Sequence, residues 1–166
     1  IVLGYRSAGG NNGRCFAGEL SEVLIYERAL SDAERAQVEE YLTDKWLGDY
    51  DTVPATPVTA GLQFRTDASV RQTVLTNAAG QTIQWRDLSG NGYHLQQATT
   101  AKQPTFNAAG MNGKPTLSFK GTNVLLTTAD TVNYSNHTVF VVAQATGVKD
   151  GVNGGENDLV GSKNLN

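Results

Sequence analysis

The sequence has little of several features that would assign a function directly. Among 166 residues there is one cysteine, Cys15, so no disulfide framework can form within the chain. We expect Cys15 to be a small buried residue, because free cysteine behaves as a hydrophobe; pairing with a cysteine elsewhere is the alternative. No apolar run approaches the roughly 18 residues of a membrane span, so we predict no membrane insertion.

Charge and catalytic motifs are equally sparse. Charged residues make up 17% of the chain and the net charge is -3, which gives no basic surface for nucleic acid. The histidines, His94 and His137, lie in no zinc-type spacing. Neither a G-x-S-x-G nucleophile motif nor a glycine-rich phosphate loop with lysine is present. We therefore expect no enzyme and no nucleic-acid partner.

One segment has the pattern of an amphipathic helix. Ser31 and Glu34 have the spacing of a capping box at a helix start. Apolar residues then recur at i, i+3, i+4 and i+8, which predicts one buried stripe, formed by Val38, Tyr41, Leu42 and Trp46. Gly48 suits the left-handed residue past a helix end. The sequence predicts a short helix near residues 32–46.

Much of the remaining sequence predicts short strands. Eighteen glycines against four prolines, with many Thr, Asn and Val, favour strands joined by tight turns. The segment 19–26 is apolar on both faces, which predicts a strand covered on both sides. The run TVFVVA at 138–143 predicts a core strand. Other strands are expected at 1–5, 61–67, 82–86, 105–106, 115–119, 124–126 and 158–162.

Two parts of the chain resemble parts of one known domain family. Residues 16–48, FAGELSEVLIYERALSDAERAQVEEYLTDKWLG, look like the closing segment of a bacterial laminin-G-like (concanavalin-A-like) domain. IQWRDLSGNGYHLQQATTAKQPTF and MNGKPTLSFKGTNVLL, within 61–147, resemble its opening strands. The resemblance implies an all-β fold: an antiparallel two-sheet jelly-roll sandwich with one short helix near residues 32–46.

The order of these parts is the reverse of the family's order. We interpret 1–48 as the C-terminal strands and helix of one repeat, 49–60 as a linker and 61–166 as the N-terminal strands of the next. Either each part belongs to its own repeat, or both pack into one permuted sandwich. We favour the permuted sandwich for an ordered structure. In separate repeats, exposed sheet edges would need covering by another chain or by further sequence of the same protein.

Glu19 and Glu22 are the nearest candidates for a catalytic pair. Glycosidases on related jelly rolls place their carboxylates on one face of a strand, and retaining enzymes need them close together. A spacing of three on a regular strand puts the side chains on opposite faces. We therefore expect no catalysis here, and we expect Glu22 to make structural hydrogen bonds near the helix.

The segment Asp87–His94, DLSGNGYH, is the strongest candidate for a local site. Asp87 and Asn91 could supply the oxygen ligands of a calcium ion. The alternative, which we favour, is a tight turn in which Asp87 accepts hydrogen bonds from backbone N–H groups.

Sugar recognition commonly uses exposed aromatic rings with nearby amides. Candidates in expected loops are Tyr93, His94, Asn133, Tyr134, Asn136 and His137. The alternative is that these rings only cover strand ends. Trp46 and Trp85 are expected in the core.

The resemblance implies an extracellular or surface-exposed, non-enzymatic module that binds glycans or mediates adhesion within a tandem-repeat surface protein. Its partner would be a glycan or cell-surface polysaccharide, with calcium a possible cofactor. One alternative is a structural repeat that builds a filament, layer or virion appendage by pairing with copies of itself through exposed sheet edges. Another is a carbohydrate-binding accessory domain of a secreted hydrolase.

Overall fold

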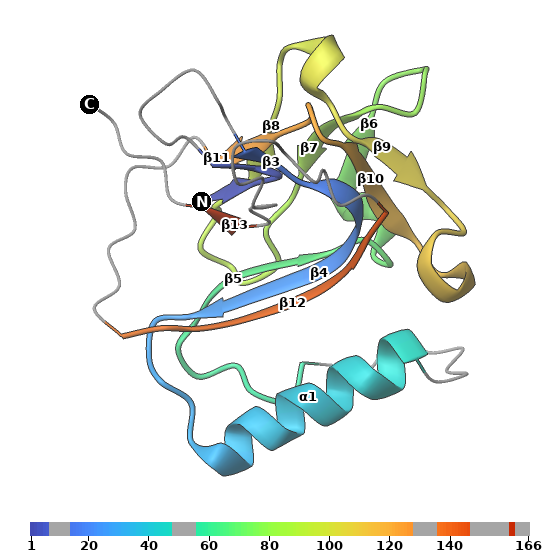
Figure 1. Cartoon of the computed structure of the whole chain (residues 1–166). Helices are drawn as coiled ribbons and strands as arrows, with labels where there is room; N and C mark the ends of the chain where they lie inside the picture. The colour runs from blue at the N-terminus through green and yellow to red at the C-terminus, as the bar shows by residue number, and fades with distance from the viewer. Residues whose placement is uncertain (7–13, 48–55, 128–135, 147–159, 162–166) are drawn as a thin grey trace.

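The computed structural model describes residues 1–6, 14–47, 56–127, 136–146 and 160–161. These residues form short strands, three 3₁₀ turns and one α-helix (Figure 1). In chain order the elements are β1 (Val2–Leu3), β2 (Tyr5–Arg6), β3 (Arg14–Cys15), β4 (Ala17–Tyr26), α1 (Asp32–Leu47), β5 (Leu62–Asp67), η1 (Arg71–Thr73), β6 (Val74–Thr76), β7 (Thr82–Trp85), β8 (Leu95–Gln96), η2 (Thr100–Lys102), β9 (Thr105–Asn107), η3 (Met111–Gly113), β10 (Thr116–Lys120), β11 (Leu125–Thr127), β12 (Thr138–Ala145) and β13 (Val160–Gly161).

The strands form two main antiparallel sheets, which confirms the all-β class with one helix. The first sheet has the order β13-β1-β11-β8-β7-β6. The second has the order β12-β4-β10-β9, with β5 also paired to β4, and β2 with β3 forms a separate ribbon. Strands from before and after the expected linker pair with one another in both main sheets, as β1 does with β11 and β4 with β5.

The strand β4 is the centre of the second sheet. Residues 18–26 of β4 pair with β12 on one side, with one irregularity at Ser21. On the other side its first half pairs with β10 and its second half with β5. One long strand therefore aligns three others, and its far end, at Tyr26, lies between β12 and β5.

Both faces of β4 are covered, as its sequence predicts. One face joins a core between the two sheets, in which Trp85 is fully buried. The other face packs under α1 with Leu24, Tyr26 and Trp46. Part of the expected linker also packs here, since Val58 is buried in the α1 cluster and its carbonyl accepts a hydrogen bond from the Tyr26 hydroxyl.

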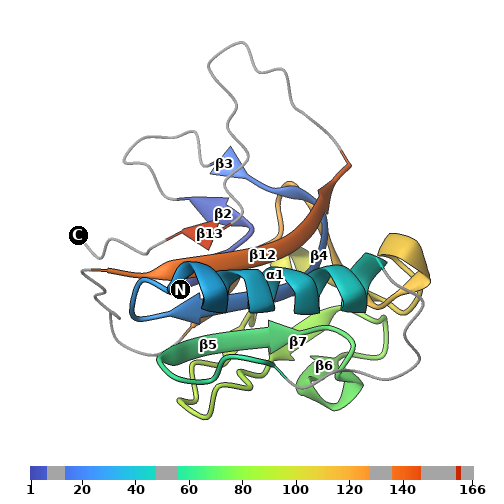
Figure 2. The same ribbon diagram turned by 90° about the horizontal axis from the view of Figure 1, so that it is seen from below.

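The helix α1 confirms the predicted pattern. Its capping box forms: the Ser31 N–H donates to the Glu34 carboxylate at 3.0 Å, and the Glu34 N–H donates to the Ser31 hydroxyl at 3.3 Å. All four residues of the apolar stripe are buried. Figure 2 shows α1 running along β4, with β12 and β5 on either side. Gly48 and the side chain of Cys15 lie outside the described residues.

The strand β12 differs from its prediction as a core strand. It pairs with β4 along one side and with no other strand in the part of the chain that the structure describes. Its residues are half-buried or exposed. The continuous apolar run arises because Phe140 and Val142 pack against the α1 cluster and Val141 against the inter-sheet core. An apolar run predicts that both faces of a strand are covered, but it does not predict whether the outer edge of that strand pairs with another strand.

Candidate functional site

A network of charged and polar side chains lies between α1 and the sheet. Glu22 is fully buried at its centre. Its carboxylate accepts hydrogen bonds from three α1 side chains, Tyr41, Lys45 and Trp46, each at 2.9 Å. Arg65 of β5 donates to the same carboxylate at 3.1 Å. The prediction that Glu22 makes hydrogen bonds near the helix is confirmed.

Asp67 of β5 completes this network. It is also fully buried, and it accepts hydrogen bonds from Lys45 and from Arg65, the latter at 3.1 Å. The Ser69 N–H and hydroxyl donate to its other oxygen at 2.9 and 2.6 Å. Two carboxylates are thus matched by one ammonium and one guanidinium group. Buried charges are tolerated only when they are paired and hydrogen-bonded in this way.

The face on which Glu22 lies is set by a β-bulge. Consecutive residues of β12 pair with Glu22 and Leu20, so Ser21 is an extra residue in β4. The bulge shifts the alternation of side chains, and Glu19 therefore lies on the same face as Glu22. Thr116 of β10 donates to Glu19 on that face. The prediction that Glu19 and Glu22 point to opposite faces is wrong, because it assumed a regular strand.

The shared face does not make Glu22 suited to acid–base chemistry on a substrate. Both of its oxygens are taken by donors from α1 and β5, and α1 covers it from solvent. Burial, with a smaller contribution from Glu22, raises the pKa of Tyr41. The Tyr41 hydroxyl therefore stays protonated and acts as a donor. The network is equipped to hold α1 on the sheet.

The Asp87 carboxylate organises the segment Asp87–His94. Its Oδ1 accepts from the backbone N–H groups of Arg65 and Ser89 at 3.0 and 2.8 Å. Its Oδ2 accepts from the Ser89 hydroxyl at 2.8 Å and from the Tyr93 N–H at 3.1 Å. The Asp87 N–H in turn donates to His94 Nδ1 at 3.1 Å. These are the contacts expected of the turn interpretation.

These contacts bear on the proposed calcium ligands. Both Asp87 oxygens already accept two hydrogen bonds each. The Asn91 amide nitrogen donates to the carbonyls of Leu62 and Gln63. Within the described residues no group of three or more His, Cys, Asp or Glu side chains could hold a metal. The donor set favours the turn, and calcium binding stays a prediction.

The same turn lies along the outer edge of β5. The Leu88 N–H donates to the Arg65 carbonyl at 2.8 Å. The Ser89 hydroxyl and the Asn91 amide donate to the Gln63 carbonyl at 2.9 and 3.0 Å. Together with the Arg65 N–H bond to Asp87, these contacts satisfy backbone groups that an open sheet edge would expose. We call residues 87–91 the edge turn.

The candidate glycan ligands divide into three groups. Tyr93 and His94 are half-buried, and Tyr93 packs against the inter-sheet core. Asn136 and His137 are exposed just before β12. The remaining two candidates, Asn133 and Tyr134, lie outside the described residues.

The structure brings the described candidates to one end of the second sheet. Tyr26 of β4 pairs with Thr138 of β12 and with Leu62 of β5, whose carbonyl accepts from Asn91. The start of β12 lies two strand spacings from the start of β5, and the edge turn lies one spacing further out, about 14 Å from β12. We call Asn91, Tyr93, His94, Asn136 and His137 the sheet-end surface.

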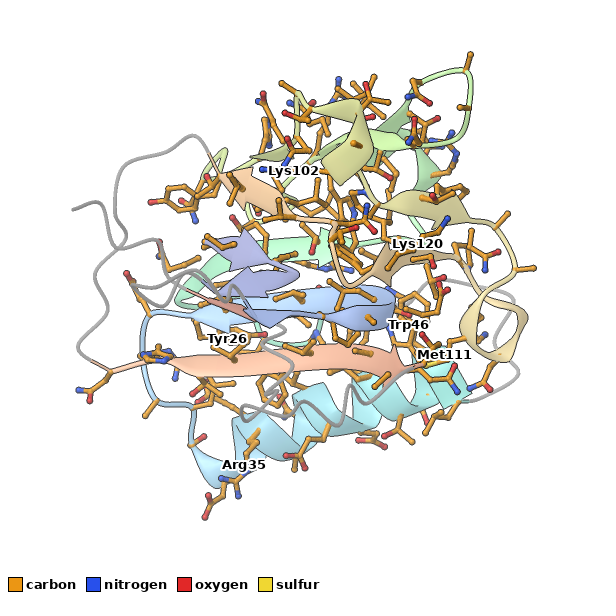
Figure 3. All side chains as sticks on the ribbon, turned by 45° about the horizontal axis from the view of Figure 1, so that its top comes forward. Tyr26, Arg35, Trp46, Lys102, Met111 and Lys120 are labelled. Carbon is orange, nitrogen blue, oxygen red and sulfur yellow. The ribbon has the colours of Figure 1, made fainter. Side chains whose placement is uncertain are left out.

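The sequence prediction did not find Lys45 and Arg65 as partners of Glu22, nor Asp67 as the second carboxylate of the network. A signal was present for all three. Lys45 falls on the apolar stripe of α1, where a charged residue needs a buried partner. Arg65 and Asp67 alternate on β5 and so share a face. Tyr26 and Trp46 are buried in the cluster between the second sheet and α1, whereas Arg35, which is 52% exposed, projects from the helix surface (Figure 3).

No family model, curated protein or solved structure matches the chain. Among the described residues, no helix is sufficiently long and apolar to cross a membrane. The resemblance to laminin-G-like domains therefore stays a prediction that rests on the sequence motifs.

Proposed function

We propose that this chain is a non-enzymatic, surface-exposed module that binds a glycan or cell-surface polysaccharide through its sheet-end surface and so mediates adhesion. The observation that carries the proposal is the gathering of Asn91, Asn136 and His137 at one end of the second sheet. Amides and imidazoles both donate and accept hydrogen bonds, as sugar hydroxyls require. The neighbouring Tyr93 ring offers an apolar surface with a polar tip.

The fold that we propose for this module is the laminin-G-like jelly roll. Its support is the pair of antiparallel sheets around a common core and the capped helix under β4. Such a module would work outside the cell, in a protein that repeats it in tandem. Function is a property of the site and not of the fold, so the glycan proposal rests on the sheet-end surface alone.

The absence of catalysis is supported by the state of the buried carboxylates. Glu22, Asp67 and Asp87 each accept at least four hydrogen bonds from protein donors. A general base needs a free lone pair within reach of the substrate proton. The alternative role, an accessory domain of a secreted hydrolase, would bind carbohydrate through the same surface. It would differ from the adhesion module only in the domains beside it.

The test is a glycan array run with the wild-type chain in calcium and again in a chelator. We expect saturable binding to one glycan class, and loss in chelator would establish calcium at the site. Asn136→Ala and His137→Ala should each weaken binding by about tenfold, the effect of losing one good hydrogen bond to the ligand.

Gln72→Ala is the matched control. Gln72 is an exposed amide on η1, away from the sheet-end surface, and its loss should leave binding unchanged. A blank array under both conditions would overturn the glycan proposal. If Asn136→Ala, His137→Ala and Gln72→Ala all bind glycan as tightly as the wild type, the binding site does not lie at the sheet-end surface.

A further inference from the structure

The edges of the two sheets are covered to very different degrees. The edge turn covers β5. Beyond β9, Gln81 bridges to Thr105 and the Phe106 N–H donates to the Gly80 carbonyl. At β6, Arg71 donates to the Val74 carbonyl. Within the described ranges, β12 is the one strand of more than three residues whose second edge pairs with no segment.

The strand β12 also lacks the usual protection of an open edge. Proteins normally protect such edges with charged residues, proline, a bulge or a very short strand. The eight residues TVFVVAQA contain no charge and no proline, and the bulge beside them lies in β4. Val139 is 38% exposed at this edge. A strand of this composition is suited to accept another strand.

We propose that β12 pairs with β12 of a second copy of this chain, antiparallel and about a two-fold axis. The two second sheets would then join into one continuous sheet. An axis at Val141 places Phe140 opposite Val142 of the second copy on the α1 face, and Val139 opposite Ala143 on the other face. This register extends both apolar layers, because opposite residues of an antiparallel pair share a face.

Charge and length favour a second copy over an unrelated strand. A strand that pairs with its own copy can place like charges opposite one another, which destabilises the pair. Because β12 has no charged residue, this repulsion does not arise. With the axis at Val141, residues 138–144 of the two identical strands lie opposite one another and satisfy each other's backbone groups.

The helices do not obstruct this pairing. Because α1 lies along β4 (Figure 2), the two copies of α1 would be three strand spacings apart, about 14 Å. That separation exceeds the helix diameter of about 10–12 Å.

The experiment is analytical ultracentrifugation of the full chain from low to high micromolar concentration. We expect a concentration-dependent dimer for the wild type. Val139→Lys should weaken dimerisation by about 100-fold, because charged residues on an edge strand oppose pairing. Ile83→Lys is the matched control: Ile83 is 42% exposed but lies in β7, which is paired on both sides by β6 and β8. It should dimerise like the wild type.

A second measurement does not depend on any variant. Amide hydrogen exchange of the wild type should show N–H groups in β12 that are protected only at high concentration. A monomer at every concentration would overturn the proposal, and so would a Val139→Lys protein that dimerises like the wild type. Glycan binding by the monomeric variant would leave the proposed function intact, so the two proposals fail separately.

Discussion

The strands β5 and β12 both pair with the second half of β4, but the two sides of the sheet are stabilised by different interactions. β5 carries Arg65 and Asp67, whose charges are paired under α1, and the edge turn covers its outer edge. β12 carries no charge. It is held by its ladder with β4 and by apolar contacts to the α1 cluster and the inter-sheet core.

The difference shows two ways of fixing a strand in a sheet. Ion pairs and charged hydrogen bonds have strict geometry, so the network permits one position of β5 against α1. Apolar burial is non-directional and leaves the position of β12 to its ladder with β4. The β5 side should therefore respond strongly to single polar substitutions, and the β12 side should respond to changes at its edge.

The largest effect is expected from Lys45→Met. Lys45 is 4% exposed and contacts both Glu22 and Asp67, so its removal leaves two buried carboxylates with one guanidinium. Breaking a buried ion pair costs about 3–5 kcal/mol. We expect the free energy of unfolding, measured by urea denaturation, to fall by that amount.

Arg35→Met is the control for Lys45→Met. Arg35 is 52% exposed on the same helix and pairs with Asp32 and Glu39. Exposed pairs contribute about 0–1 kcal/mol, so the free energy of unfolding should change little. If Lys45→Met and Arg35→Met lower the free energy of unfolding equally, the buried network stabilises the protein no more than an exposed ion pair does.

An intermediate effect is expected from Asp87→Ala. The substitution removes the four hydrogen bonds that Asp87 accepts, three of them from the backbone N–H groups of Arg65, Ser89 and Tyr93. We expect a loss of about 2–3 kcal/mol by urea denaturation. Asn91→Ala removes only contacts of an exposed side chain and should cost about 0.5–1 kcal/mol.

Asp87→Ala also tests the comparison of the two edges. If the edge turn keeps β5 from pairing with other chains, Asp87→Ala should self-associate even when Val139→Lys blocks β12. Sedimentation of the double variant measures this. If the double variant stays monomeric, the edge turn is not what keeps β5 from pairing with other chains.

The smallest effect concerns the anchor between the start of α1 and the residues before β5. Arg28 donates to both oxygens of Glu34 and to the Ala60 carbonyl. The hydrogen bonds from Arg28, and next those from Ser31, lower the pKa of Glu34 from 4.5 to about 2. Because the folded pKa is the lower one, this contribution is complete above pH 4.5 and is lost as the pH falls towards about 2.

The measurement for this anchor is the melting temperature between pH 6 and pH 2, for the wild type and for Glu34→Gln. The wild type should be slightly more stable above pH 4.5, and the difference should shrink below it. Glu39→Gln, on the exposed surface of α1, serves as the control. A difference that stays constant down to pH 2 would contradict the lowered pKa.

Local patterns predicted the parts of the fold that depend on local physics. The capping box at Ser31, the buried stripe of α1 and the two-sided cover of β4 all follow from spacings within one segment. The edge position of β12 could not be predicted, because the identity of a strand's neighbours is not encoded in its own alternation.

The candidate site was predicted less well for the same reason. The bulge at Ser21 is visible only in the pairing with β12, and it decides where Glu19 points. The partners of Glu22 come from segments that lie 19 to 43 residues away along the chain. The Asp87 turn was predicted because its contacts are mostly local, whereas its role as a cover for β5 needed the structure.

The buried network has a consequence for how the two halves of this chain can come together. Glu22 and Lys45 belong to the unit of β4 and α1, and Arg65 and Asp67 both belong to β5. Each half is formally neutral by itself. The β4–α1 unit can therefore close first, and β5 can join it later, without an unmatched charge of this network being buried at either step.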